Sequence, residues 1–180
     1  KSRVKFTVGS AYDIPFDDNF FDLVMCGGAT SFMDDKKQAV NEYFRVIKPW
    51  GFLAVTQLFY SKKPPQKTLN DVSKIINSEI KYMTKEDWLR VFEQNNTYEL
   101  YHFEEANFKE HTDIELKEYV ASFLDKPHIR DLDENIKKAI FDKWFRYMNV
   151  FNENSKYLSY FIALFRKNIL EEEKEYFIKK

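Results

Sequence analysis

Cysteine is nearly absent from this sequence, which contains a single one, Cys26, among 180 residues. One cysteine excludes an internal disulfide and leaves no Cys/His cluster with the spacing of a zinc site. No stretch approaches the ~20 consecutive apolar residues of a membrane-spanning helix, and the first residues show no signal-peptide pattern. We therefore expect a cytoplasmic protein that has no metal site and no membrane partner.

An excess of charge of one sign is also lacking, because 28 Lys and Arg residues are balanced by 29 Asp and Glu residues. The net charge of -1 provides no field that would attract nucleic acid, so we expect no nucleic-acid partner. The composition, with 44% hydrophobic and 32% charged residues, is typical of a soluble globular protein. A length of 180 residues suits a single domain, 1–180, with one core.

Glycine is scarce, and its distribution is uneven. All four glycines lie within the first 51 residues, at Gly9, Gly27, Gly28 and Gly51. Glycine lets a backbone turn sharply or approach a ligand closely. The sequence therefore predicts that the constrained geometry, and a ligand crevice, lie in the stretch from Gly9 to Val55.

Three short β-favouring runs in the first third of the chain predict β-strands: Val4–Val8, Phe21–Met25 and Phe52–Thr56. The second run is apolar without alternation, as expected of a parallel strand covered on both faces. Between the second and third runs, Asp34 or Asp35 can cap a helix over 36–47. Strand, helix and strand in succession predict a right-handed crossover in a parallel sheet, and so an α/β fold.

The remainder of the chain predicts further helices and two more strands. Helices are expected over 70–80, 113–124 and 133–149, and another after Thr84, with Asp87 three residues on as in a capping arrangement. That last helix would end at Asn95 and Asn96. Strands are expected over Tyr98–Phe103 and Tyr157–Phe165, the latter central because it is almost continuously apolar.

Two segments together, VKFTVGSAYDIPFDDNFFDLV and RVIKPWGFLAV, resemble the class I S-adenosylmethionine-dependent methyltransferases. The resemblance is to the ubiquinone and menaquinone biosynthesis branch, the type 11 methyltransferases, and it covers residues 4–56 in detail. It implies a Rossmann-like, mostly parallel sheet and S-adenosylmethionine as the cofactor. It also implies methyl transfer to a small-molecule acceptor, whose identity the sequence does not reveal.

The same resemblance implies positions for the cofactor. Ser10 and Ala11 would lie at the edge of the adenine, with Ile14 as an apolar neighbour of that ring. Cys26 and Gly27 would face the amino group of the methionine moiety, Gly28 would allow close approach, and Phe32 would cover the cofactor. Asp22 would be a structural residue at the entrance of its strand.

The sequence departs from the family pattern in three ways. Ser10 replaces an aspartate, and Trp50 replaces the first glycine of P-G-G, so the turn after Pro49 should avoid a positive φ at Trp50, for instance as type I. Third, no glycine-rich G-x-G-x-G turn is present, and no upstream strand ends in an acidic residue that would hold the ribose. The chain is thus expected to be the C-terminal part of such an enzyme, with a sheet that is incomplete at its N-terminus.

The family sheet order, 3-2-1-4-5-7-6, would leave Val4–Val8 without its inner neighbour, and unpaired buried backbone groups are costly. We expect one of three situations: a further N-terminal part, a second chain that fills the gap, or a rearranged strand.

Methyl transfer requires mainly that nucleophile and methyl group be held in line, so no catalytic side chain is assigned. A base is needed only for some acceptors, and His102, His111 and His128 are candidates or else plain strand, loop and helix-start residues. Thr30, Ser31 and Tyr60 follow predicted strand ends, where open α/β sheets bind ligands, so they could line the acceptor pocket or simply be polar loop residues. Cys26 is better explained as a small half-buried filler than as a nucleophile.

A helical insertion or lid is expected over 113–149, before the last strand. It carries an apolar stripe: Phe123, Ile136, Ile140, Trp144 and Tyr147. The stripe could cover an acceptor pocket, but core packing or a homodimer face explains it better.

Three functions remain open. The first is the C-terminal part of an active small-molecule methyltransferase, which would bind S-adenosylmethionine once the missing strand and glycine turn are present. The second is a non-catalytic remnant that acts as an interaction module. The third, a dehydrogenase, is disfavoured because the P-F-x-x-x-x-F-D and R-V-I-K-P runs have no role in hydride chemistry.

Overall fold

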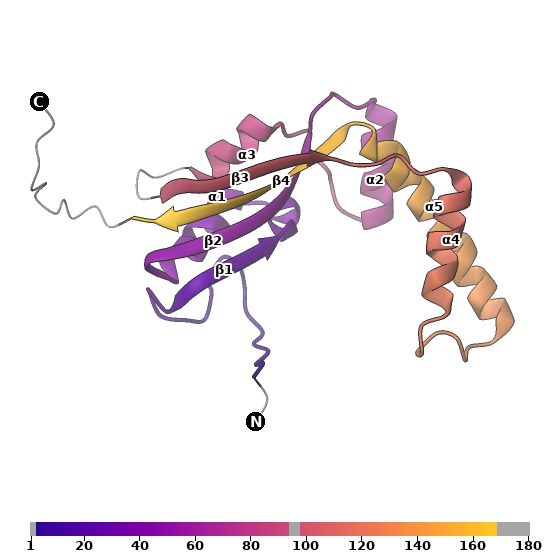
Figure 1. Cartoon of the computed structure of the whole chain (residues 1–180), viewed down its shortest axis with the longest axis horizontal. Helices are drawn as coiled ribbons and strands as arrows, with labels where there is room; N and C mark the ends of the chain where they lie inside the picture. Colours follow the sequence, from indigo (N-terminus) through magenta and orange to yellow (C-terminus); the bar gives the residue numbers. More distant parts are fainter. Residues whose placement is uncertain (1–2, 94–97, 169–180) are drawn as a thin grey trace, which may run out of the picture. The chain divides into compact units, whose positions relative to one another are not determined.

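The computed structural model describes residues 3–93 and 98–168 (Figure 1). Its elements in chain order are β1 (Phe21–Gly27), the 3-10 helix η1 (Ala29–Phe32), α1 (Lys36–Arg45), β2 (Ile47–Tyr60), α2 (Gln66–Ile76), α3 (Lys85–Phe92), β3 (Tyr98–Asn107), α4 (Asp113–Leu124), α5 (Glu134–Ser155) and β4 (Leu158–Lys167). The helix ending expected at Asn95 and Asn96 lies outside the described residues.

The described chain divides into two compact units. The sheet unit comprises the described residues of 1–58, 85–105 and 160–180. The helical unit comprises Phe59–Thr84 and Ala106–Ser159. Each unit is built from segments that are far apart in the sequence.

The four strands form one sheet in the order β1-β2-β4-β3. β1 and β2 are parallel, with Leu23 opposite Phe52 and Gly27 opposite Thr56, whereas the arrow of β4 points the opposite way in Figure 1. The expected strand-helix-strand crossover and the expected α/β fold are confirmed. The interior position predicted for the last strand is also confirmed, because β4 lies between β2 and β3.

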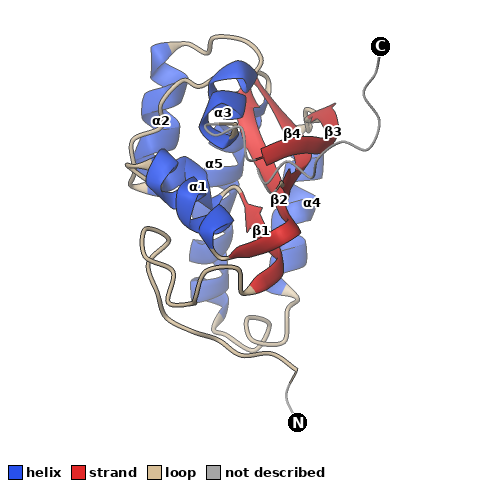
Figure 2. Ribbon diagram, turned by 90° about the vertical axis from the view of Figure 1, so that its left-hand side faces the viewer, coloured by secondary structure: helices blue, strands red, loops and turns tan. Residues whose placement is uncertain are grey.

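Helices α1 and α3 cover one face of the sheet (Figure 2). Phe44 of α1 and Phe92 of α3 are both fully buried, and each packs its ring against Phe165 of β4, at centroid distances of 6.4 and 5.5 Å. Asp35 begins α1 as one of the two predicted caps, because its Oδ1 accepts a hydrogen bond from the Gln38 N–H at 2.9 Å. Aromatic rings from α1, α3 and β4 thus form part of the core of the sheet unit.

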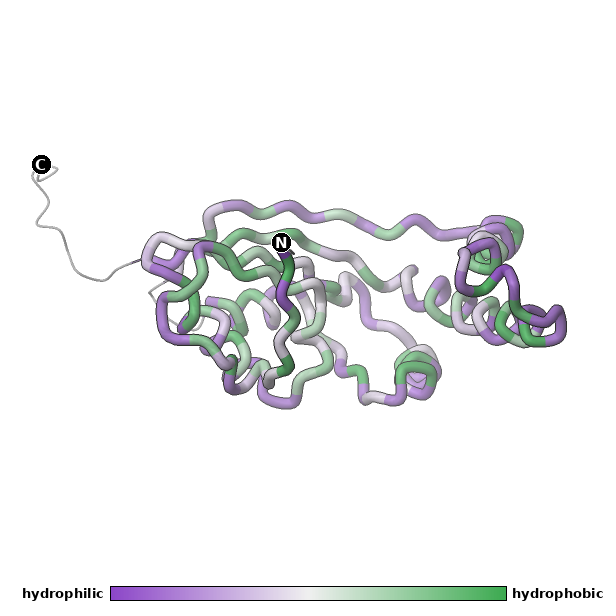
Figure 3. The backbone as a smooth tube through the Cα atoms, turned by 90° about the horizontal axis from the view of Figure 1, so that it is seen from below, coloured by the Kyte–Doolittle hydropathy of each residue, from purple (hydrophilic) through white to green (hydrophobic). Residues whose placement is uncertain are grey.

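The strand predicted over Val4–Val8 does not form. The segment belongs to no strand of the sheet, and its apolar side chains at Val4, Phe6 and Val8 are 62%, 94% and 102% exposed. In Figure 3 the chain next to the N label alternates between green, hydrophobic patches and purple, hydrophilic ones. A strand needs a neighbour for its N–H and C=O groups, and within the described residues this segment has none in the sheet.

The prediction that the strand Phe21–Met25 is buried on both faces is also wrong. Leu23 is 48% exposed and Met25 is 77% exposed, so this strand is not buried on both faces. The physical reason is its place at the edge of the described sheet, where β2 is its neighbour on one side. Its apolar side chains are therefore only partly covered by the described residues.

Trp50 has a positive φ of 64°, contrary to the prediction that the turn would avoid one. The register explains this conformation, because β2 advances from Ile47 to Phe52 while β1 advances from Phe21 to Leu23. The extra residues of β2 form a bulge. Within it the backbone at Gly51 packs tightly, since a Cβ there would lie 2.9 Å from the Asp22 carbonyl oxygen, and the preceding residue, Trp50, adopts the positive φ. The guanidinium of Arg166 lies 5.2 Å from the centroid of the Trp50 ring.

Helices α2, α4 and α5 make up most of the helical unit, in which α5 packs against both α2 and α4. The limits predicted for α4 are confirmed, and Thr112 and Glu115 form a capping box at its start. The helix predicted over 70–80 instead spans Gln66–Ile76, because it starts directly after Pro65 and ends at Asn77 in the left-handed region. α5 continues to Ser155, beyond the predicted end at 149.

Candidate functional site

The carboxyl end of β1 provides open space next to the backbone. A Cβ built on Gly27 would meet nothing within 4 Å. Gly28 follows with a φ of 79°, a conformation that favours glycine, and the chain then turns into η1. The two glycines therefore have different roles: Gly28 makes the turn, and Gly27 leaves room for a ligand.

A cluster of polar and sulfur-containing side chains, Cys26, Thr30, Met33 and Tyr43, supports this end of β1. Cys26 Sγ lies 3.2 Å from Thr30 Oγ1, which in turn lies 3.3 Å from the Tyr43 hydroxyl. The Tyr43 hydroxyl donates to Met33 Sδ at 3.6 Å. Burial raises the pKa of Tyr43 to about 12. Tyr43 therefore stays uncharged at neutral pH, and the cluster fixes β1 and η1 onto α1.

The residues of η1 differ in how far they reach the surface. Thr30 is completely buried, whereas Phe32 is 58% exposed. Ser31 Oγ accepts a hydrogen bond from Nε2 of the buried Gln57 of β2 at 2.7 Å. Thr30 is thus a supporting residue, and its neighbours Ser31 and Phe32 remain accessible.

The loop that precedes β1 is shaped by a tight turn at Ser10. The Asp13 N–H donates to the Ser10 carbonyl at 3.2 Å, and the Tyr12 N–H donates to Ser10 Oγ at 3.1 Å. These turn bonds do not use the N–H of Ala11, and they leave the Ser10 hydroxyl proton available for donation. A turn with these two donors can bind the edge of a heterocycle.

Tyr12 attaches this turn to the start of α1. Its hydroxyl accepts a hydrogen bond from the Asp34 N–H at 2.9 Å, and its carbonyl accepts one from Gln38 Nε2 at 3.1 Å. The Cys26 cluster is attached to the same part of the chain through Met33 and Tyr43. Both sets of predicted cofactor residues are therefore anchored on the segment 33–43.

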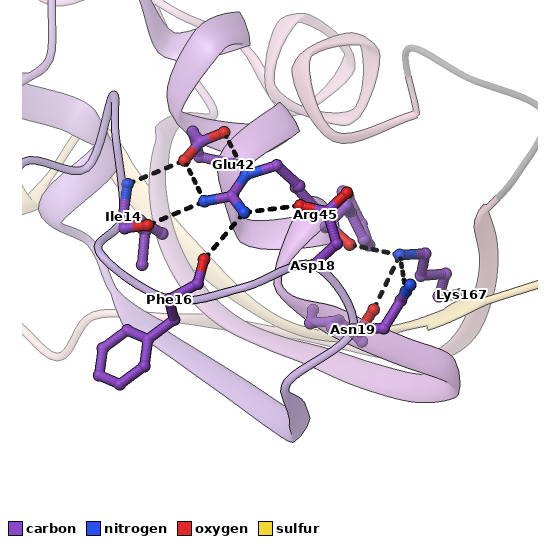
Figure 4. A network of polar contacts seen from close by, with 9 residues as sticks. Ile14, Phe16, Asp18, Asn19, Glu42, Arg45 and Lys167 are labelled. Carbon is purple, nitrogen blue, oxygen red and sulfur yellow. Dashed lines mark hydrogen bonds and ion pairs between the residues drawn. The ribbon is translucent and has the colours of Figure 1, made fainter.

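Arg45 and Glu42 hold the middle of the same loop (Figure 4). Arg45 donates to the carbonyl oxygens of Ile14 at 2.8 Å and Phe16 at 2.9 Å, and to Asp18 Oδ1 at 2.7 Å. Glu42 Oε2 accepts from the Ile14 N–H at 2.8 Å, and its two oxygens accept from Arg45 at 2.7 and 2.8 Å. The hydrogen bonds from Arg45 hold the pKa of the Glu42 carboxyl below its ordinary value.

Tyr60, which ends β2, is buried in the helical unit. Its hydroxyl donates to Asn154 Oδ1 at 3.1 Å, and burial raises its pKa. Its hydroxyl is therefore used in an internal contact, and a role for Tyr60 toward the acceptor stays a prediction.

The three histidines occupy ordinary surface positions. His102 lies on β3 with Nε2 3.0 Å from Glu104, His111 lies just before the cap of α4, and His128 lies between α4 and α5. Among the residues that the structure describes, no group of His, Cys, Asp and Glu could hold a metal ion. No helix of the described part is long and apolar enough to cross a membrane.

The predicted apolar stripe of the α4–α5 hairpin is partly internal. Phe123 stacks on Trp144 at 5.7 Å, whereas Ile136 and Trp144 remain 50% and 40% exposed. A hollow of about 380 Å³ lies at the turn of the hairpin, lined by Leu124, Asp125, Arg130, Glu134, Lys137, Lys138 and Phe141. Its lining carries charges of both signs and so favours no ligand charge.

The residues that sequence reasoning missed are Tyr12, Glu42, Tyr43 and Arg45. They are polar residues that support the loop and the end of β1. Glu42, Tyr43 and Arg45 lie far in sequence from the main chain that they hold. A signal was present in Glu42 and Arg45, which are oppositely charged residues three positions apart on one helix face.

Comparison with known proteins finds similarity to methyltransferases in the first part of the chain. Residues 1–55 match the family model described as a methyltransferase domain. The demethylmenaquinone methyltransferase of Lactiplantibacillus plantarum is 39% identical over 62 residues, 34% of this chain and 26% of that protein. The ubiquinone/menaquinone biosynthesis C-methyltransferase UbiE of Idiomarina loihiensis is 33% identical over 70 residues, 39% of this chain and 27% of that protein.

Among solved structures, the MccD protein has a similar fold. The TM-score is 0.74 with 24% sequence identity, and the match covers 89% of this chain and 66% of that one. The matches thus cover less than two thirds of each of these three relatives. At this identity the structural likeness shows the fold alone, and a fold does not determine a reaction.

Proposed function

We propose that this chain is part of a class I S-adenosylmethionine-dependent methyltransferase, and that its site binds S-adenosylmethionine and serves methyl transfer to a small-molecule acceptor. The observation that carries the proposal is the open space beside Gly27 at the carboxyl end of β1. In α/β sheets, ligands bind outside the carboxyl ends of the strands. Because the chain matches only part of its relatives, the activity of the whole protein is included in this proposal.

The turn at Ser10 would hold the adenine. The Ser10 hydroxyl and the Ala11 N–H are the two donors that its own hydrogen bonds leave available. Ile14 is half-buried, with its main chain fixed by Glu42 and Arg45, and its side chain would contact the ring. The serine donates a proton where the family aspartate would accept one, so we assign the Ser10 contact to a ring nitrogen of the base.

The end of β1 would hold the methionine moiety. The backbone oxygens of Cys26 and Gly27 would accept hydrogen bonds from its amino group. Because Gly27 has no side chain, there is room for the methionine moiety beside the backbone. Thr30 and Tyr43 keep Cys26 in position through the buried cluster. Phe32, which is 58% exposed, would cover the ligand and exclude water.

S-adenosylmethionine supplies an electrophilic methyl group when it is bound. The contribution of this chain is then to fix the ligand and to orient the acceptor in line with it, which can provide most of the catalysis. Ser31 is the accessible polar residue closest in sequence to the glycines, and we assign it to the acceptor side. We also propose a cytoplasmic, reducing location, since the half-buried Cys26 has no second cysteine with which to pair.

Isothermal titration calorimetry of the natural protein with S-adenosylhomocysteine tests this function. Saturable binding at one site is the expected result. Absence of binding would contradict the proposal and favour an interaction module that keeps the fold. Protection against thermal unfolding by a nicotinamide cofactor, without protection by S-adenosylhomocysteine, would instead favour a dehydrogenase.

A further inference from the structure

The loop that would carry the adenine contacts has little structure of its own. Between Gly9 and Phe20 it contains one bridge, Ser10 to Asp13, and no helix or strand. Loops of this kind are mobile unless other parts of the molecule hold their backbone. The precision of the proposed adenine site therefore depends on what fixes this loop.

The guanidinium of Arg45 contacts this loop at three points, which are two residues apart. Its bonds reach Ile14 O, Phe16 O and Asp18 Oδ1. Glu42 completes the arrangement by orienting the guanidinium with both oxygens while accepting from the Ile14 N–H. Ile14 is thus held at its N–H by Glu42 and at its carbonyl by Arg45.

The pair is well shielded for charged side chains, with 30% of Arg45 and 16% of Glu42 exposed. A planar guanidinium can make several directed hydrogen bonds at once, which the single ammonium of a lysine cannot reproduce. The arrangement therefore requires arginine for its geometry and not only for its charge.

We propose that Glu42 and Arg45 are positioning residues for ligand recognition, which hold the loop of Ser10, Ala11 and Ile14 in the conformation that selects adenine. This inference rests on the proposed function. Neither side chain would touch the ligand; both act through the main chain of Ile14 and Phe16. Loosening them would lower affinity for the adenosyl ligand and, more specifically, selectivity for adenine over bases with a different hydrogen-bonding edge.

The test uses the Arg45→Lys variant of the natural protein, with Arg90→Lys as the matched control. Arg90 lies on α3 and pairs with Asp87 at 3.5 Å, away from the loop hydrogen bonds. Affinities for S-adenosylhomocysteine and S-inosylhomocysteine are measured by calorimetry, together with the melting temperature. We expect Arg45→Lys to weaken S-adenosylhomocysteine binding about tenfold and to weaken S-inosylhomocysteine binding much less, with Arg90→Lys unchanged.

The outcomes separate the two proposals. If the wild-type protein binds neither ligand, the proposed function is wrong. If wild type binds and Arg45→Lys keeps both affinity and selectivity, the positioning role is wrong. An equal loss for both ligands would also overturn it, because a general loss of stability does not discriminate between bases. Glu42→Gln serves as the second variant if Arg45→Lys does not fold, with the same loss of selectivity expected.

Discussion

The ammonium of Lys167, near the end of β4, donates a hydrogen bond to the carbonyl oxygen of Phe44 near the end of α1 at 2.8 Å. It also donates to the carbonyl of Ile47 at 2.8 Å and to Asn19 Oδ1 at 2.9 Å (Figure 4). The last carbonyls of a helix have no partner within the helix, and here a lysine 123 positions away in the sequence supplies one. Burial lowers the pKa of this lysine.

Replacing Lys167 with methionine should lower the free energy of unfolding by about 2 kcal/mol, because three main-chain or side-chain acceptors lose a charged donor. The matched control is Lys48→Met, which removes a lysine paired with the exposed Asp22 and should have a much smaller effect. Urea unfolding followed by circular dichroism measures both. Equal losses would show that the contacts of Lys167 add nothing to stability.

Trp50 offers a test of backbone strain. Trp50→Ala and Trp50→Gly both remove the ring that faces Arg166, but only glycine adopts a φ of 64° without steric cost. We expect the glycine variant to be more stable than the alanine variant by about 1 kcal/mol. Thermal unfolding of the two variants side by side decides this, and an alanine variant of equal or greater stability would contradict it.

Glu115 should make the stability of α4 dependent on pH. Its hydrogen bonds with Lys109 and the Thr112 N–H lower its pKa from 4.5 to about 2. Because the folded-state pKa lies below the unfolded one, its contribution is complete above pH 4.5 and is lost as the pH falls toward 2.

The Glu115→Gln variant should therefore melt at a lower temperature than wild type at pH 7, with the difference shrinking as the pH falls through this range. Glu118→Gln, which changes an exposed residue of the same helix, is the control and should show no such trend. A difference that stays constant with pH would mean that the Glu115 charge has no role in stability.

Local patterns in the sequence were sufficient for the crossover from β1 through α1 to β2, because the apolar runs, the Asp35 cap and the helical spacing each act within a few residues. The interior place of β4 also followed from its composition. The strand expected at Val4–Val8 failed because strand formation depends on a neighbour that lies elsewhere, whatever the residues favour locally. The conformation of Trp50 depended on the register between β1 and β2, which no local pattern shows.

The candidate site could be predicted only in its main-chain elements. The glycines and the turn at Ser10 could be recognised in the sequence, because glycine and serine are favoured in turns. The residues that hold this main chain, Tyr43 and Arg45, do so through contacts such as those with Thr30 and Ile14, which lie 13 and 31 positions away. Such contacts arise from packing of the helix onto the loop, so they became visible only in the structure.

Gly27 provides the most direct test of the ligand site. A Cβ there would meet nothing within 4 Å, and the φ of Gly27 lies outside the left-handed region, so we expect Gly27→Leu to leave the melting temperature unchanged. In the proposed complex, that same side chain would occupy the space of the methionine moiety. Ala139→Leu, at an exposed position of α5, is the matched control.

The deciding measurement is the affinity of wild type and Gly27→Leu for S-adenosylhomocysteine by calorimetry, with the melting temperature recorded for each protein. We predict that wild type and Ala139→Leu bind alike, and that Gly27→Leu binds more than about tenfold more weakly while melting at the same temperature. Undiminished binding by a folded Gly27→Leu variant would contradict the placement of the ligand at the end of β1.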